Sequence, residues 1–184
     1  MSVPEHTTGE ELHAGLDHIR SSPADVGTVE LIVRRPAENL REVLDEAELD
    51  LEVGLVGDRW HLGSSSTNDS QLTLMNARLA QLVAQGRERW PLAGDQLYVD
   101  LDLSAKNLPA GTRLAVGEAV IELTDVPHTG CAKFSARFGT DALKFVNKSP
   151  GRELRLRGAN ARVVTPGLVR VGDAISKLQE AEHS

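Results

Sequence analysis

The chain has 184 residues, of which 40% are hydrophobic, 26% charged and 3% aromatic, and its formal net charge is −7. This length predicts one domain, and we expect a cytoplasmic protein without a signal peptide or transmembrane helix, because the N-terminus is polar and acidic and no apolar run approaches about 18 residues. The single cysteine, Cys131, excludes an intrachain disulfide, a structural CxxC zinc site and an iron–sulfur cluster held by four cysteines of this chain.

The N-terminal part of the chain predicts two helices with a strand between them. Residues 8–11 have the spacing of a capping box, and apolar residues at helical intervals follow, so we expect an amphipathic helix to about Arg20. Alternating apolar and polar residues predict a strand over 29–34. Pro36 is expected to open a second helix, because the apolar residues of 40–47 would share one helical face.

The middle of the chain alternates between strands and loops. Apolar residues alternate again over 49–53, which favours a strand, and residues 57–66 have the composition of a loop. A strand is predicted over 72–74, and Asn76 is the expected N-cap of a helix that continues through Val83.

Beyond Pro91 the pattern changes to short strands separated by glycine turns. One strand is predicted over 96–103, and residues 114–123 predict a β-hairpin in which Gly117 supplies the positive φ of the turn. The same pattern returns over 169–175 and predicts a second hairpin. Many short strands with few long apolar runs indicate an α+β domain: a closed or nearly closed β-barrel of short antiparallel strands with peripheral helices.

The segment around Cys131 is the most informative for chemistry. Pro127 and Gly130 follow a predicted strand, so Cys131 is expected on a loop or at the start of a helical turn, where reactive groups tend to lie. Lys133, Arg137 and a protonated His128 would favour the thiolate and lower the pKa of Cys131 below about 8.5. The alternative is a buried cysteine that acts as a small hydrophobic residue.

Other polar residues in turn-like segments offer weaker signals. Asp58 and Arg59 can hold the amide and phosphate groups of a ligand, or they can pair with each other at a turn. His61, His128 and Cys131 can be imagined around zinc, but no HxxxH or CxxC pair supports that site. A Cys–His hydrolase would need a histidine within hydrogen-bonding distance of the thiol, which spacing alone does not decide.

Residues 133–162 form a basic stretch in an acidic chain. They hold eight Lys or Arg side chains against two carboxylates, so the stretch carries +6 and the remainder of the chain −13. Such asymmetry indicates a face that binds anions, although the same side chains can simply solvate the outer faces of a helix and a strand. With few aromatic side chains among them, a small anionic ligand fits this charge better than nucleic acid.

Several of these segments, taken in chain order over residues 28–178, resemble the MOSC domain family, which is named after the C-terminal domain of molybdenum-cofactor sulfurase. The resemblance depends on the order and spacing of the segments, since no single one is specific. They are Gly57-Asp58-Arg59, Asn107-Leu108, the hairpin 116–124, the block His128-Thr129-Gly130-Cys131-Ala132-Lys133, Arg157-Gly158, and the ending 161–173.

The resemblance implies a fold and a site. The fold would be a MOSC barrel, similar to the β-barrel domain of pyruvate kinase, with a helical extension over 1–27, the barrel domain over 28–178 and a tail over 179–184. In the family the loop cysteine carries sulfur as a persulfide or ligates the molybdenum of a pterin cofactor, molybdopterin. By position Cys131 takes that role as catalytic residue and metal ligand. The other implied site residues are His128 and Lys133, which would tune the thiol, and Asp58, Arg59, Asn107 and Arg157, which would hold the cofactor.

The implied function is that of a stand-alone MOSC protein, either a sulfur transferase or a molybdenum-cofactor-dependent reductase. The chain has no pyridoxal-phosphate desulfurase domain and no ferredoxin-like cysteines, so a cysteine desulfurase or an electron-donor protein is expected as a separate partner. We expect a small anionic ligand and neither nucleic acid nor membrane as partner. The alternative is a binding or interaction module on the same fold, with Cys131 packed and inert.

Overall fold

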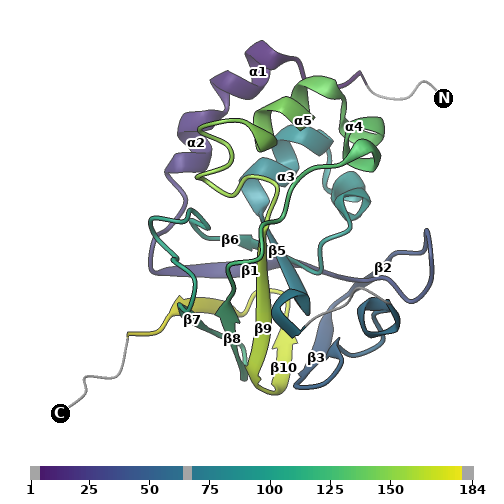
Figure 1. Ribbon diagram of the computed structural model, residues 1–184, viewed down its shortest axis with the longest axis vertical. Coiled ribbons are helices and arrows are strands. Elements are labelled where there is room, and N and C mark those ends of the chain that lie inside the picture. The colour runs from purple at the N-terminus through teal and green to yellow at the C-terminus, as the bar shows by residue number, and fades with distance from the viewer. Residues whose placement is uncertain (1–4, 64–67, 180–184) are drawn as a thin grey trace.

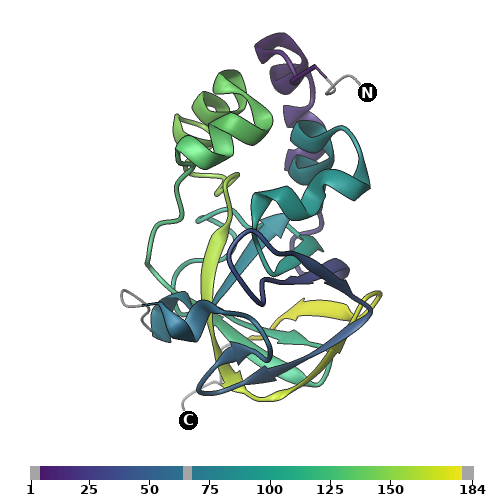
Figure 2. The ribbon, with the colours of Figure 1, turned by 90° about the vertical axis from the view of Figure 1, so that its right-hand side faces the viewer.

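The computed structural model describes residues 5–63 and 68–179, and it consists of a β-barrel with helices gathered over one end (Figures 1 and 2). Part of the loop predicted over 57–66, including Ser64 to Ser66, lies outside the described residues. Within the described ranges, no helix is long and apolar enough to span a membrane.

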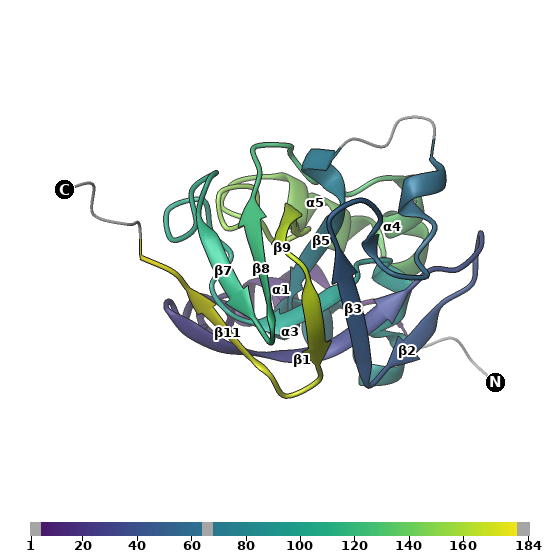
Figure 3. The same cartoon turned by 90° about the horizontal axis from the view of Figure 1, so that it is seen from below.

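Within the described residues, seven strands close into the barrel, in the order β11-β7-β8-β9-β5-β6-β1, and β1 pairs with β11 to complete the ring (Figure 3). Neighbouring barrel strands are antiparallel except β5 and β6, which are parallel. The predicted α+β barrel is therefore confirmed, with one parallel pair that the short-strand pattern did not indicate. The strands are β1 (Val26–Arg34), β5 (Leu72–Asn76), β6 (Leu97–Asp100), β7 (Arg113–Val116), β8 (Ala119–Leu123), β9 (Ala159–Thr165) and β11 (Ala174–Lys177).

The helix predicted from Pro36 is wrong. A turn region leads into β2 (Glu42–Leu44), which pairs with the end of β1, and then into β3 (Glu46–Asp50). Leu40 and Val43 are 55% and 58% exposed, so the face that would have been buried in a helix does not exist. Pairing of β3 with β10 (Gly167–Arg170) and β4 (Gly54–Leu55) selects the extended conformation, because it buries Ala47 and Leu49 on one side.

One of the two predicted hairpins is confirmed. Strands β7 and β8 pair around Gly117, whose φ is 54°. The second is wrong, because β10 joins the small sheet with β3 whereas β11 pairs with β7 and β1 in the barrel. The turn at Gly172 therefore carries the chain from one sheet to the other, which a local pattern cannot distinguish from a hairpin turn.

Five helices and three 3₁₀ turns occur in the described part of the chain. The predicted N-terminal helix is divided at Gly15, which faces Leu82, and it begins where Thr8 accepts a hydrogen bond from the N–H of Glu11. Asn76 caps α3 as predicted. The helices are α1 (Gly9–Ala14), α2 (Leu16–Arg20), α3 (Ala77–Ala84), α4 (Ala132–Phe138) and α5 (Thr140–Asn147), and the 3₁₀ turns are η1 (Trp60–Leu62), η2 (Asn68–Ser70) and η3 (Arg87–Ala93).

The buried side chains form two hydrophobic clusters. One fills the barrel interior, and the other lies between the outer surface of the barrel and the helices. A bulge in β1 lets Val29 and Ile32 enter the first cluster while Leu31 and Val33 enter the second. Leu12 of α1 and Ile19 of α2 also belong to the second cluster, so the segment predicted as an extension packs into the same body as α3 and α5. The division of the chain at residues 27 and 178 stays a prediction.

The close approach of β1 to β6 allows a test of the fold. A Cβ added at Gly27 of β1 would lie 1.9 Å from the carbonyl oxygen of Asp100, so Gly27→Ala must push strands apart. We expect the free energy of unfolding to fall by roughly 3 kcal/mol, measured by urea denaturation. Gly9→Ala is the matched control, because its nearest neighbour would lie at 3.7 Å. Equal free energies of unfolding for the two variants would contradict the close contact between β1 and β6 at Gly27.

Candidate functional site

Cys131 lies where the loop after β8 enters α4, as its sequence neighbours predict. It is the N-cap residue of this seven-residue helix, with an extended backbone and an exposed side chain. Asn147 of α5 fixes the loop from behind, because its amide accepts from the N–H of Gly130 at 2.8 Å and donates to its carbonyl at 3.0 Å. The thiol therefore lies at the surface on a restrained loop, and the alternative of a buried, packed Cys131 is wrong.

The environment lowers the pKa of Cys131 below its ordinary value. The N–H of Phe134 in the first turn of α4 contributes most, and that of Lys133 adds to it, because both favour a negative sulfur. Partial burial opposes this effect, and the charges of Arg157 and Arg137 support it. The predicted direction is confirmed, and the backbone of the first helical turn contributes more to it than the basic side chains do.

Beside Cys131 is a cavity of about 480 Å³, which we call the cationic cavity. This volume is in the range of sites for small organic ligands. Six basic side chains and one carboxylate, that of Glu38, line it among the described residues. The basic ones are Arg35, Arg41, Arg59, Lys133, Arg137 and Arg157.

Only part of the basic stretch contributes to this cavity. Lys133, Arg137 and Arg157 line it, whereas Arg162 pairs with Glu122 at 3.0 Å on the barrel surface. The remaining basic side chains of the cavity come from residues 35–59, which the charge count had assigned to the acidic body. Convergence of two distant segments therefore produces the positive site, and a charge count along the chain detects only one of them.

Asp58 does not face the cavity. Its side chain is 0% exposed, and its carboxylate accepts from the backbone and guanidinium of Arg35 and from the N–H of Trp60. Asp58 thus holds Arg35 and the start of η1 in place, and it has no free surface for a ligand. Its neighbour Arg59 lines the cavity, so the two residues that the sequence analysis grouped have separate roles.

Asn107 also lies outside the cationic cavity. Its amide donates to the carbonyl oxygens of Ala24 and Asp102, both at 2.8 Å, and accepts from Lys177 at 3.2 Å. These contacts tie the loop before β7 to the segment before β1 and to β11. The structure therefore gives Asn107 a role in the barrel, away from Cys131.

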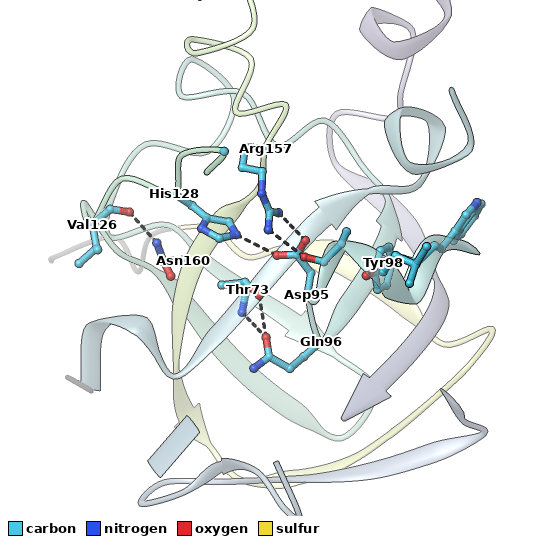
Figure 4. A network of polar contacts seen from close by, with 12 residues as sticks. Thr73, Asp95, Gln96, Tyr98, Val126, His128, Arg157 and Asn160 are labelled. Atoms are coloured by element: carbon cyan, nitrogen blue, oxygen red, sulfur yellow. Dashed lines mark hydrogen bonds and ion pairs between the residues drawn. The ribbon is translucent and has the colours of Figure 1, made fainter. Parts of the chain in front are cut away.

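His128 belongs to a polar network with Asp95 and Arg157 (Figure 4). Its Nε2 lies 3.0 Å from Oδ1 of Asp95, whose other oxygen accepts from Arg157 at 2.7 Å. His128 lines a second cavity of about 210 Å³, and Arg157 lines both cavities. In the described part of the chain no hydrogen bond joins His128 to Cys131, and no three metal-ligating side chains gather, so neither a Cys–His pair nor the His61–His128–Cys131 zinc site is formed.

Asp95 is the functional candidate that sequence reasoning missed. It is 1% exposed, and its pKa is held well below the usual range: burial raises it, but the charge of Arg157 and the hydrogen bond with His128 lower it more. A single acid before a strand has no distinguishing local pattern. Only the folded chain shows that it lies beside an arginine 62 residues away.

A family model for the MOSC domain matches residues 65–176. The chain belongs to the MOSC domain family. Among solved structures, the YuaD protein of Bacillus subtilis is 17% identical with a TM-score of 0.61, over 84% of this chain and 97% of that one. YiiM of Escherichia coli is 20% identical with a TM-score of 0.55, over 85% and 72%, and YiiM of Geobacillus stearothermophilus is 12% identical with 0.53, over 86% and 75%. No curated protein matches the chain.

At these identities the solved structures support the fold alone. They share with this chain the barrel and its helices, in agreement with the MOSC assignment. The family is associated with molybdenum-cofactor-related proteins, and Cys131 lies within the matched range.

The acidity of the thiol is directly measurable. The rate of alkylation of Cys131 by iodoacetamide should rise with pH through an inflection below about 8.5, the ordinary value for a thiol. Arg137→Gln should move the inflection to higher pH, because it removes a charge that favours the thiolate. Arg170→Gln, which removes a cation paired with Glu46 on the small sheet, should leave it unchanged. An inflection at or above the ordinary value in the native chain would show that burial dominates.

Proposed function

We propose that this MOSC protein binds molybdenum cofactor, molybdopterin, in the cationic cavity, with the Cys131 thiolate as a ligand of the metal. The observation that carries the proposal is an exposed thiol of lowered pKa beside a cavity with six basic side chains and one acid. The phosphate of a pterin cofactor is an anion of the kind such side chains bind, and thiolate is a soft ligand.

The residues present fit such a group. Arg157 is 8% exposed, and its Nε is a buried side-chain nitrogen without a hydrogen-bond partner among the described residues. A buried donor without a partner is costly, and an anionic or carbonyl oxygen near this arginine would relieve that cost. The cavity volume of about 480 Å³ also suits a ligand of this size.

Different residues of the chain activate the thiol and bind the phosphate. The N–H groups of Phe134 and Lys133 lower the pKa of Cys131 and so favour the thiolate form that binds a metal. Arg59 and Lys133 are exposed at the cavity and can turn toward the phosphate. Arg157 is instead fixed by hydrogen bonds to Asp95 and to the carbonyl of Ala93. When bound, the cofactor supplies two-electron redox chemistry at the metal, for which an electron-donor protein would be the partner.

A sulfur carrier is the second candidate, and the exposure of Cys131 favours it because a protein donor can reach the thiol. In that reaction the Cys131 thiolate attacks the outer sulfur of the persulfide on a cysteine desulfurase. The new S–S bond forms on Cys131 as the donor's own cysteine leaves as a thiolate, so no external oxidant is needed. The inert interaction module is the least supported, since it requires a packed Cys131.

Two assays on the same three proteins separate these functions, and the first measures retention of molybdenum. The native chain, Cys131→Ser and Thr129→Ala are loaded with molybdenum cofactor released from a donor molybdoenzyme, and the retained molybdenum is measured. The native chain and Thr129→Ala, an exposed change on the same loop, should retain the metal, whereas Cys131→Ser should lose most of it because an alkoxide replaces a soft thiolate poorly.

Incubation of the same three proteins with a cysteine desulfurase and cysteine provides the comparison. A gain of one sulfur mass on the native chain but not on Cys131→Ser, without metal retention, would replace the cofactor proposal by the sulfur carrier. Identical behaviour of the native chain and Cys131→Ser in both assays would support the interaction module.

A further inference from the structure

We infer that Asp95 is a positioning residue of the cationic cavity: it fixes Arg157 at the inner wall and is itself held by His128 from the second cavity. The inference extends the proposed function, from which it takes the anionic character of the ligand. It assigns roles to two side chains that do not line the cationic cavity.

Asp95 is fully committed to this contact. It follows Gly94, whose φ of 85° turns the chain from η3 into β6, and its side chain is 0% exposed. One carboxylate oxygen accepts from Nη1 of Arg157 at 2.7 Å, and the other contacts Nε2 of His128 at 3.0 Å (Figure 4). Because both oxygens are used inside the protein, Asp95 acts on a ligand through the side chains that it contacts.

Arg157 is held on three sides. Asp95 accepts a hydrogen bond from Nη1, and the carbonyl of Ala93 accepts one from Nη2 at 2.9 Å. The centre of the Phe134 ring lies 5.1 Å from the guanidinium carbon of Arg157. Arg59 and Lys133, in contrast, are exposed at the same cavity. Arg157 is therefore the pre-organised cation of the cavity, and it binds an anion at a smaller cost in side-chain entropy than a mobile lysine or arginine.

His128 completes the arrangement from the other side. It lines the 210 Å³ cavity together with Arg157, and its ring also packs against Gly158, where an added Cβ would lie 2.7 Å from the ring carbon Cδ2. A side chain in this place fixes the second oxygen of Asp95, so the carboxylate cannot rotate away from Arg157. The segment 128–133, which contains Cys131, therefore also supports Arg157, because His128 holds Asp95 and Asp95 holds Arg157.

A positioning role and a purely electrostatic role of Asp95 predict opposite effects of its removal on anion binding. If Asp95 acted only as a negative charge near the cavity, its removal would strengthen the binding of anions. If it positions Arg157, its removal frees the guanidinium and weakens the binding of anions although the cavity becomes more positive. The sign of the change therefore separates the two roles.

The test uses the chain without cofactor and inorganic phosphate as the probe. Phosphate bound in the cationic cavity should protect Cys131 from alkylation by iodoacetate. The concentration that gives half protection is measured for the native chain, Asp95→Asn, His128→Ala and His128→Gln. Asp95→Asn should need about tenfold more phosphate, which corresponds to one charge-assisted hydrogen bond. His128→Ala should shift in the same direction by a smaller factor, and His128→Gln should restore protection because its amide can donate to Asp95.

Asp100→Asn is the matched control, since it removes a carboxylate that pairs with Arg78 at 2.9 Å away from the cavity. It should leave protection unchanged. If Asp95→Asn does not fold, the two His128 variants decide: a shift in His128→Ala that His128→Gln reverses supports the inference, and no shift overturns it. Tighter phosphate binding in Asp95→Asn, or no protection of the native chain, also overturns it. Failure of the native chain to retain molybdenum overturns the proposed function alone, because phosphate protection is measured without the cofactor.

Discussion

Pairing of β1 with β11 is the contact on which the rest of this structure depends. It closes the barrel, because β1 also pairs with β6 and so joins the two ends of the strand order. In the closed ring, the segment before β6, the loop after β8 and the turn before β9 lie at the end of the barrel that carries the helices (Figures 1 and 2). Asp95, Cys131 and Arg157 lie on those three segments, which are close because β8, β9, β5 and β6 are successive neighbours in the strand order.

The electrostatics of the site follow from this convergence. Arginines collected at one cavity would repel one another, and the chain offsets part of that repulsion with buried carboxylates behind the wall. Asp58 holds Arg35 and Asp95 holds Arg157. Gln96, the residue after Asp95, donates to Asp58 at 3.3 Å. A cavity of this design presents fixed positive groups to a ligand while the carboxylates stay out of its reach.

Local signals in the sequence were sufficient where the structure is decided locally. The hairpin at Gly117 and the cap at Asn76 were predictable because each depends on a few adjacent residues, and so was the position of Cys131 at the start of a helix. The helix expected after Pro36 failed, because pairing of β3 with β10, about 120 residues further along the chain, outweighs the local apolar spacing.

The candidate site was only partly predictable for the same reason. Arg59, Lys133 and Arg157 line the cavity beside Cys131, but Asp58 and Asn107 are committed to structural contacts and His128 lines a second cavity. Similarity to a family places residues near a site, whereas the direction of each side chain depends on its folded neighbours. Asp95 shows the limit most clearly, since both of its partners are distant in sequence.

The proposed function requires that the Cys131 sulfur and the cationic cavity hold one ligand together. X-ray diffraction from crystals of the cofactor-loaded protein, recorded at the molybdenum absorption edge, tests it most directly. We expect an anomalous peak at bonding distance from Cys131 Sγ, with the phosphate of the cofactor against basic side chains of the cationic cavity. A molybdenum peak elsewhere on the molecule, with an empty cavity beside Cys131, would contradict it.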